Sequence, residues 1–336
     1  MVKENYIKKS RGLSLFSGGL DSQLAVKVLQ RAGAHVEAIT FVTPFFSPDT
    51  AIKAAKALGV ELHLVDFTND EIELIKNPPH GFGSAMNPCI DCHATMIKRA
   101  GEIMIEKGFD FIATGEVVNQ RPMSQNKQAM RTVEKSSGFE GRLVRPLSAL
   151  LLEPTIPETE GILDRSQLLD LSGRRRERQA ELASEFGLVD YPSPGGGCKL
   201  TEKGFCKKLK DLMDNEGLDE RRLVELLLVG RRFRLPGGSS VILGRELADN
   251  KKLESVRTPT DTLLAPVSVP GPTAIIPAVN SPDDIELAAR IVCAWSKFDK
   301  FKGNAIVVKK LKGDSREDIS ITPPYSRDNL IQFQIT

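Results

Sequence analysis

The stretch LSLFSGGLDS, which spans Leu13–Ser22, decides the fold of this chain. An apolar run with β-propensity ends abruptly at Ser-Gly-Gly, and an amphipathic stretch with helical spacing follows. This order predicts a strand, a glycine turn and the N-terminus of a helix. The glycines let the backbone approach a ligand closely, and the free N–H groups of a helix start favour phosphate. The alternative is an ordinary turn capped by Asp21, but the complete string favours a phosphate-binding loop.

The residues around this loop alternate between strand and helix patterns. Strands are expected at 12–16, 35–42, 61–66 and 109–114, and helices at 21–31, 48–58 and 92–107. This alternation predicts an α/β fold, a doubly wound parallel sheet covered by helices on both faces. Such sheets bind ligands at the carboxyl ends of their strands. The glycine turn and the sequence Thr114-Gly115-Glu116 both lie at such ends.

A second, smaller α+β domain is expected after the Pro- and Gly-rich segment 191–197, which predicts a loop. We therefore predict domains at 1–200 and 201–336. Before the loop, helices are expected at 165–171 and 174–186. Beyond it, the patterns predict helices at 202–215, 219–228 and 281–295, and short strands at 231–235, 241–243, 273–276, 305–308 and 330–334.

Composition excludes several classes of protein. The chain has 336 residues, of which 40% are hydrophobic and 27% charged, as in soluble globular proteins. It shows neither an apolar run that could cross a bilayer nor the apolar core of a secretory signal, so we expect a cytoplasmic protein without a membrane partner. The net charge of +2 is too small to indicate a nucleic-acid binder. Any RNA surface must come from local clusters, such as Arg174–Arg178 or Arg231–Arg234, and each of these is equally compatible with a solvated face.

The five cysteines are Cys89, Cys92, Cys198, Cys206 and Cys293. Cys89 and Cys92 form a C-x-x-C at a predicted helix start, a position that lowers thiol pKa, and Cys198 follows three glycines. Three interpretations remain open: a redox pair, a zinc site with two further ligands, or, with Cys198, a [4Fe–4S] site with one open iron. His93 is expected to cap the helix rather than to bind metal. Cys206 and Cys293 lie on apolar helix faces and are expected to be buried thiols.

The string Ser17-Gly18-Gly19-Leu20-Asp21-Ser22 resembles the SGGxDS signature of PP-loop ATP pyrophosphatases, which grip the pyrophosphate of ATP and transfer AMP to a substrate oxygen. The resemblance implies ATP and Mg²⁺ as cofactors. It implies that residues 17–19, Asp21 and Ser22 line the ATP phosphates, with Asp21 near Mg²⁺. Glu116 lies at a predicted strand end and is expected to contact Mg²⁺ or the ribose. The expected cofactor-binding residues are Ser17, Gly18, Gly19, Asp21, Ser22, Thr40, Gly115 and Glu116.

Two further stretches are similar to tRNA thiolation enzymes. Residues 87–92, followed by Ile97-Lys98, resemble the NPCxxC…IK stretch of tRNA 2-thiouridylases. Residues 113–125 resemble the TGE…Q…SQ stretch of tRNA 4-thiouridine synthetases, with one extra residue between Gln120 and Ser124. Both groups adenylate a tRNA uridine and replace its carbonyl oxygen with sulfur. Cluster-dependent members hold [4Fe–4S] by a C-x-x-C and one distant cysteine, which implies Cys89, Cys92 and Cys198 here.

The same resemblance implies roles for the remaining candidate residues and partners. Asp21, the three cysteines and Lys98 are the expected catalytic residues, with Lys98 stabilising the adenylate, although a solvated lysine is an equal alternative. Zinc, or no metal and a cysteine persulfide, is the alternative to the cluster. The expected partners are tRNA and a sulfur donor, either sulfide or a cysteine desulfurase.

The C-terminal part has a resemblance of its own. Residues 237–250, which contain Gly244-Arg245, look like the G-x-x-x-x-V-G-R-x-x-x-x-N segment of the NFACT RNA-binding domain. The sequence therefore predicts an ATP-dependent tRNA thiolation enzyme with an RNA-binding module. An amide-forming PP-loop ligase, which needs no cysteine trio, and a non-catalytic RNA-binding protein are the alternatives.

Overall fold

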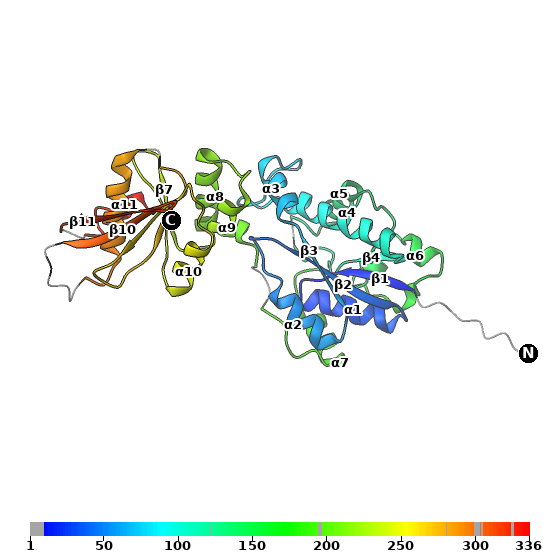
Figure 1. The fold of residues 1–336 in the computed structure, drawn as a ribbon. Helices are drawn as coiled ribbons and strands as arrows, with labels where there is room; N and C mark the ends of the chain where they lie inside the picture. The colour runs from blue at the N-terminus through cyan, green and yellow to red at the C-terminus, as the bar shows by residue number, and fades with distance from the viewer. Residues whose placement is uncertain are drawn as a thin grey trace, which may run out of the picture. The chain divides into compact units, whose positions relative to one another are not determined.

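The computed structural model describes residues 10–121, 123–193, 197–279, 281–298, 303, 305–323 and 326–336. The chain divides into two compact units, Met1–Thr201 and Glu202–Thr336 (Figure 1). Each unit has its own sheet and its own hydrophobic core.

The first unit is built on a five-stranded sheet with the order β3-β2-β1-β4-β5. All four strand pairs are parallel. The predicted parallel α/β sheet is thus confirmed, and the loop that follows the central strand opens at its carboxyl end. The strands are β1 (Arg11–Leu15), β2 (His35–Val42), β3 (Leu62–Asp66), β4 (Phe111–Ala113) and β5 (Leu143–Val144).

Helices cover both faces of this sheet, as a doubly wound fold requires (Figure 1). One layer holds α1 (Leu20–Arg31), α2 (Asp49–Leu58) and α7 (Glu177–Glu185). The other holds α3 (Thr68–Lys76), α4 (Cys89–Lys107) and α5 (Lys127–Ser137). Each layer buries its own apolar cluster against the sheet.

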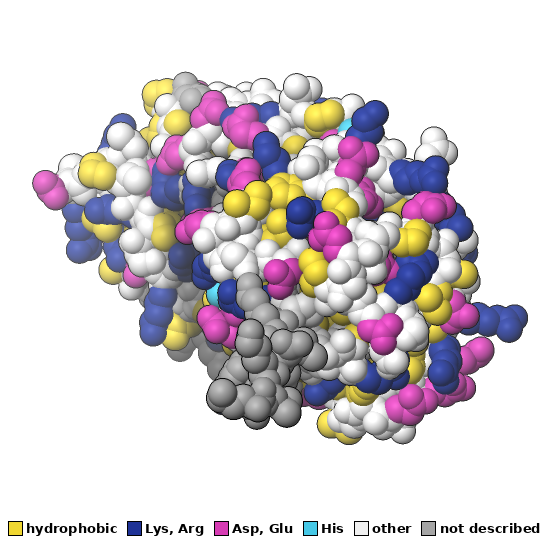
Figure 2. Space-filling view, turned by 90° about the vertical axis from the view of Figure 1, so that its right-hand side faces the viewer, with side chains coloured by type: hydrophobic (Ala, Val, Ile, Leu, Met, Phe, Trp, Pro, Cys, Tyr) yellow, Lys and Arg dark blue, Asp and Glu magenta, His cyan; other side chains and the backbone are white. Residues whose placement is uncertain are grey.

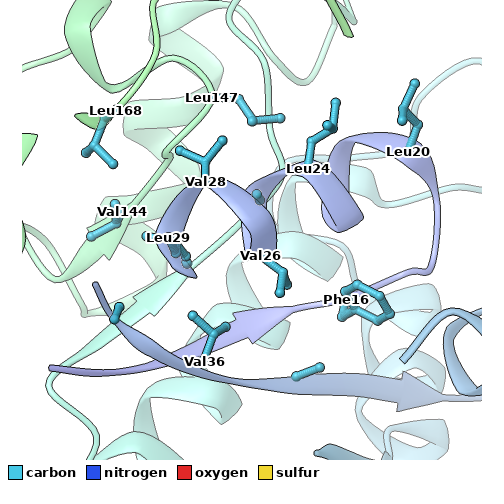
Figure 3. Close-up of a cluster of buried hydrophobic side chains, with 14 of the residues drawn as sticks. Phe16, Leu20, Leu24, Val26, Val28, Leu29, Val36, Val144, Leu147 and Leu168 are labelled. Atoms are coloured by element: carbon cyan, nitrogen blue, oxygen red, sulfur yellow. The ribbon is translucent and has the colours of Figure 1, made fainter. Parts of the chain in front are cut away.

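Helix α1 is buried on two sides, which holds its N-terminus firmly at the sheet. Figure 3 shows Val26 of α1 pointing toward the strands, where Phe16 and Val36 lie. On its other side, Val28 points toward Leu147 and Leu168. Close packing of this kind leaves little room for the helix to shift.

Parts of the first unit differ from the expectation. The helix predicted at 165–171 is wrong, because only the 3₁₀ turn η2 (Arg165–Gln167) forms there. The Asp164 side chain accepts from Ser166 N, and Leu168 is already extended. The sequence patterns also did not reveal α3, α5 or β5. Three further short elements complete the unit: η1 (Ala149–Leu151), α6 (Ile156–Thr159) and η3 (Lys199–Thr201).

The second unit contains a six-stranded antiparallel sheet with the order β11-β10-β8-β9-β7-β6. Helix α11 (Pro282–Ala294) packs its apolar stripe on this sheet. The smaller α+β domain is thus confirmed. Its strands are β6 (Arg231–Arg234), β7 (Ser240–Leu243), β8 (Thr262–Pro266), β9 (Ala274–Ile276), β10 (Ile306–Lys312) and β11 (Ser315–Ile321).

The strand predicted at 330–334 is wrong. A 3₁₀ turn, η4 (Ile331–Phe333), occupies most of it, and a single bridge joins Gln334 to Phe233. Strands β8 and β11 and one helix were not predicted. The other helices of this unit are α8 (Lys203–Asn215), α9 (Arg221–Leu226) and the unpredicted α10 (Leu247–Ser255).

The surface agrees with the small net charge. On the face drawn in Figure 2, basic and acidic side chains are interspersed. Among the described helices, none combines the length and apolar character that crossing a bilayer requires.

Candidate active site at the carboxyl end of the parallel sheet

The loop between β1 and α1 is held in a conformation that only glycine adopts easily. Gly18 has φ +75°, and a Cβ there would lie 2.5 Å from the carbonyl oxygen of Thr50. The Gln23 side chain donates to Gly18 O at 2.7 Å, and the Thr40 hydroxyl donates to Phe16 O. Thr40, an expected nucleotide contact, therefore supports the loop from the neighbouring strand.

The first turn of α1 presents polar groups without a capping side chain. Its N-cap residue is Gly19, which provides no side-chain acceptor for the free helix N–H groups. Ser22 Oγ donates to Gly19 O at 2.8 Å, and Ser17 Oγ lies 3.4 Å from Ser22 Oγ. Uncapped N–H groups and the positive end of the helix dipole together favour an anion.

Asp21 is the acidic residue of this turn, and one of its carboxylate oxygens accepts no hydrogen bond from the described residues. Oδ2 accepts from Gln120 Nε2 at 2.7 Å and lies 3.4 Å from a guanidinium nitrogen of Arg176. Oδ1 is buried and has no hydrogen-bond partner in the described part of the protein. A buried carboxylate oxygen without a partner is costly, so the donor set fits a Mg²⁺ ion, a hard cation that prefers oxygen ligands.

The loop after β4 packs directly on the start of α1. A Cβ on Gly115 would lie 2.7 Å from backbone atoms of Asp21 and Ser22. This close approach brings Glu116 to the same edge of the sheet. Glu116 is buried, its Oε2 accepts from Arg145 Nε at 3.0 Å, and Oε1 has no hydrogen-bond partner among the described residues.

The charge of Glu116 is maintained by its neighbours. Burial raises the pKa of Glu116, but the nearby Arg145, His93 and Thr114 outweigh burial and leave the pKa below its usual value. Burial lowers the pKa of His93, whose Nδ1 lies 3.8 Å from Glu116 Oε1. A negative Glu116 whose Oε1 makes no hydrogen bond can accept from a ribose hydroxyl or bind a cation.

Replacing Arg145 by Met is expected to lower the free energy of unfolding by about 3–5 kcal/mol, because it leaves the buried Glu116 carboxylate without its partner. Denaturant unfolding monitored by circular dichroism measures this change. Arg99→Met is the matched control. Arg99 is exposed and pairs with Asp70 and Glu102, so its loss is expected to cost less than about 1 kcal/mol. Equal losses of unfolding free energy in the two variants would contradict the role of Arg145 as the partner of the buried Glu116.

The two cysteines of the C-x-x-C occupy the first turn of α4. Asn87 Nδ2 donates to Cys89 Sγ at 3.1 Å. Cys92 is buried, and its Sγ donates to Glu71 Oε2 at 3.1 Å. His93, the next residue, approaches Glu116, so the start of α4 contacts the loop that packs on Asp21.

Cys198 approaches this pair from far along the chain. Burial first, and then the charges of Glu71, Cys198 and Cys89, raise the pKa of Cys92 well above its ordinary value. The following residue, Lys199, donates its N–H to Phe45 O at 2.8 Å, beyond the carboxyl end of β2. Cys198 therefore lies near enough for its charge to act on Cys92, and the residue after it lies beyond the carboxyl end of β2.

The raised pKa of Cys92 corrects one expectation. A helix start was expected to favour the thiolate, but the burial of Cys92 and the adjacent Glu71 raise the pKa of its thiol. A free thiolate at Cys92 is therefore disfavoured, whereas coordination to a metal deprotonates a thiol outright. The donor chemistry thus fits a metal centre better than an unassisted nucleophile at this position.

The spacing of the thiols bears on the kind of metal. Within the described part of the chain, three ligand atoms lie within 4.8 Å of one another only at Glu37, Glu61 and His63, and not at the cysteines. A tetrahedral zinc ion would hold its sulfur ligands about 3.8 Å apart. The three cysteines do not show this spacing.

Two residues near the site were not found from the sequence. Glu71 lies on the unpredicted helix α3, where burial raises its pKa to about 7. Arg176 belongs to the Arg174–Arg178 cluster, a candidate RNA surface by sequence, yet it contacts Asp21. Arg178 of the same cluster pairs with Glu181 on the surface of α7. No local pattern distinguishes these residues, because their burial depends on distant elements.

The other expected residues are not part of this grouping. Lys98 is exposed on α4, and no described residue forms a hydrogen bond or ion pair with it. Cys206 and Cys293 are buried in the second unit. Burial raises the pKa of Cys293 to about 12, which agrees with the expected apolar thiol.

Comparisons with known proteins match two parts of the chain. Residues 8–153 match the family described as thiamine biosynthesis protein (ThiI), and residues 230–333 match the NFACT protein RNA binding domain. The two domain resemblances that the sequence predicts are thus confirmed over these ranges.

Curated relatives include a probable tRNA sulfurtransferase from Caldanaerobacter subterraneus, which is 31% identical over 32% of this chain and 29% of the relative. Another, from Aeropyrum pernix, is 27% identical over 60% of this chain and 48% of the relative. The chain thus spans less than half the length of these relatives. A solved 4-thiouridine synthetase–RNA complex with bound ATP is 21% identical, with a TM-score of 0.35, over 53% of this chain and 52% of that one.

Proposed function

We propose that this protein, with its ThiI-type and NFACT-type domains, is an ATP-dependent tRNA thiolation enzyme. In the proposed reaction, AMP is transferred from ATP to a uridine carbonyl oxygen, pyrophosphate leaves, and sulfur then displaces AMP. One observation carries the proposal. A continuous series of contacts joins the phosphate-binding turn to the C-x-x-C, from Asp21 through Gly115 and Glu116 to His93.

The first half-reaction needs binding of the triphosphate and stabilisation of the departing pyrophosphate. The uncapped start of α1 and the hydroxyls of Ser17 and Ser22 are suited to the phosphate oxygens. The free oxygens of Asp21 and Glu116 would hold Mg²⁺. Arg176 would move from Asp21 to the leaving pyrophosphate, where a guanidinium binds two oxygens at once.

The second half-reaction needs a sulfur nucleophile beside the activated carbon. Cys89, Cys92 and Cys198 would hold a [4Fe–4S] cluster, which when bound supplies an open iron position for hydrosulfide. Glu71 and Asn87 orient two of the thiols through hydrogen bonds. Sulfide is the proposed source of sulfur for the cluster route. In the alternative, a cysteine desulfurase would transfer the outer sulfur of its own persulfide to Cys89 or Cys198, which leaves the desulfurase thiol free.

The uridine must leave its stack to enter such a pocket. The second unit, with its RNA-binding-type domain, is proposed to hold the tRNA while this happens. The proposed compartment is the cytoplasm, where unmodified tRNA and reduced thiols coexist.

The test uses anaerobically purified full-length protein with ATP, Mg²⁺, sodium sulfide and an unmodified tRNA transcript. We expect AMP release that depends on tRNA, and a thiolated nucleoside detected by mass spectrometry and by retardation in a mercury-containing gel. Iron and sulfide analysis of the same preparation tests the cluster. AMP release that instead requires ammonia and a carboxylate substrate would support an amide-forming ligase and overturn the proposal.

A further inference from the structure

Four cationic side chains gather on the second unit, and we call them the Gly230 cluster: Lys208, Arg231, Arg245 and Arg327. Lys208 Nζ and a guanidinium nitrogen of Arg245 both donate to the carbonyl oxygen of Gly230, at 3.4 and 2.6 Å. Arg231 follows this glycine directly, at the start of β6. Arg327 lies close enough for its charge to act on Arg231.

The remaining arginines of β6 behave differently. Arg232 and Arg234 face the opposite side of the strand, since side chains alternate along it. Both form ion pairs with Asp211 of α8 and with Glu216, at 2.7–2.9 Å. The Arg231–Arg234 segment therefore holds two arginines that form internal ion pairs and one arginine that belongs to the Gly230 cluster.

The charges of the Gly230 cluster are poorly balanced. The pKa of Arg231 is lowered by its burial and then by the charges of Arg245 and Arg327. The pKa of Lys208 is lowered by its burial and then by the charges of Arg245 and Arg232. Asp249 is the carboxylate that opposes both shifts, and its Oδ2 accepts from the backbone N–H of Arg245 at 2.9 Å. No described residue forms a hydrogen bond or ion pair with the Arg231 side chain. Like charges held together in this way are relieved by an anion.

The chemistry of the cluster suits a phosphodiester. Guanidinium groups bind two phosphate oxygens at once, and lysine adds a point charge. The guanidinium carbon of Arg327 lies 5.4 Å from the centre of the Trp295 ring, which is partly exposed. Cations beside an aromatic face are typical of surfaces that bind unpaired RNA.

We propose that the Gly230 cluster binds backbone phosphates of tRNA. This inference rests on the proposed function, since it takes tRNA as the anion. It goes beyond the family match, because Lys208 lies on α8, outside residues 230–333. The site is therefore completed by a helix that precedes the RNA-binding-type domain.

The test measures binding of a fluorescent tRNA transcript to full-length protein by anisotropy, at several salt concentrations. Lys208→Gln and Arg231→Gln are each expected to weaken binding about five- to tenfold at 0.1 M salt, and to reduce the slope of log K against log salt by about 0.7–0.9. Arg316→Gln is the matched control. It removes one positive charge from the same unit, but Arg316 is exposed and already pairs with Asp318, so binding should change less than twofold.

Thermal unfolding separates a binding role from a structural one. Removing a cation that its neighbours repel should leave the midpoint unchanged or raise it, whereas a structural role would lower it. The inference would be overturned if both variants bound tRNA with the affinity and salt slope of the wild type. It would also be overturned if the variants lost binding to phosphatidylserine vesicles but kept their binding to tRNA. If the wild-type protein bound no tRNA, the proposed function itself would fail.

Discussion

Cys198→Ala is expected to reduce tRNA thiolation by more than about a hundredfold, because it removes one of the three thiols proposed to hold the cluster. It is also expected to remove most of the bound iron, since two cysteines cannot hold the cluster alone. ATP-dependent release of pyrophosphate should persist, because Cys198 does not contribute to the loop around Gly18. The measurements are thiolated nucleoside, iron content and pyrophosphate in the same preparation.

The matched control is Cys293→Ala. Cys293 is fully buried in the core of the second unit, so its replacement is expected to cost about 1 kcal/mol of unfolding free energy while thiolation and iron content stay unchanged. A Cys198→Ala protein that retains full thiolation would refute the role of the trio. Retained iron with lost thiolation would instead support a persulfide on Cys198.

Gly18→Ala is expected to lower the free energy of unfolding by about 2–4 kcal/mol and to abolish ATP binding. Two effects combine: the left-handed backbone at φ +75° strains any residue with a Cβ, and that Cβ would lie 2.5 Å from Thr50 O. The loop must therefore move away from α2, and the start of α1 loses its alignment with the triphosphate. Denaturant unfolding and ATP calorimetry measure the two consequences.

Gly33→Ala separates the two effects. Gly33 has φ +87°, but a Cβ added there would meet nothing within 4 Å, so only the backbone strain of about 1 kcal/mol should remain. ATP affinity should stay within about twofold of the wild-type value, since the glycine lies at the far end of α1. Similar losses in both variants would show that the close approach of Gly18 to α2 has no role.

Local signals in the sequence predicted the elements that carry the nucleotide site. The apolar run before Ser17, the two glycines and the helical spacing after Asp21 all act within one short segment, so β1, the turn and α1 formed where expected. The C-x-x-C was placed correctly at a helix start for the same reason. The failures occurred where local signals are weak, as at 165–171, where the turn at Asp164 prevails over the helical pattern.

The sequence by itself determined which chemical groups the protein has and which short elements present them, because turn residues and apolar spacing act between near neighbours. Only the tertiary structure decided which distant groups meet. It brought Arg176 to Asp21, buried Glu71 against Cys92, and separated Arg231 from Arg232 on opposite sides of one strand. These contacts depend on how helices pack across the sheets, and packing is set by the whole core rather than by any local stretch.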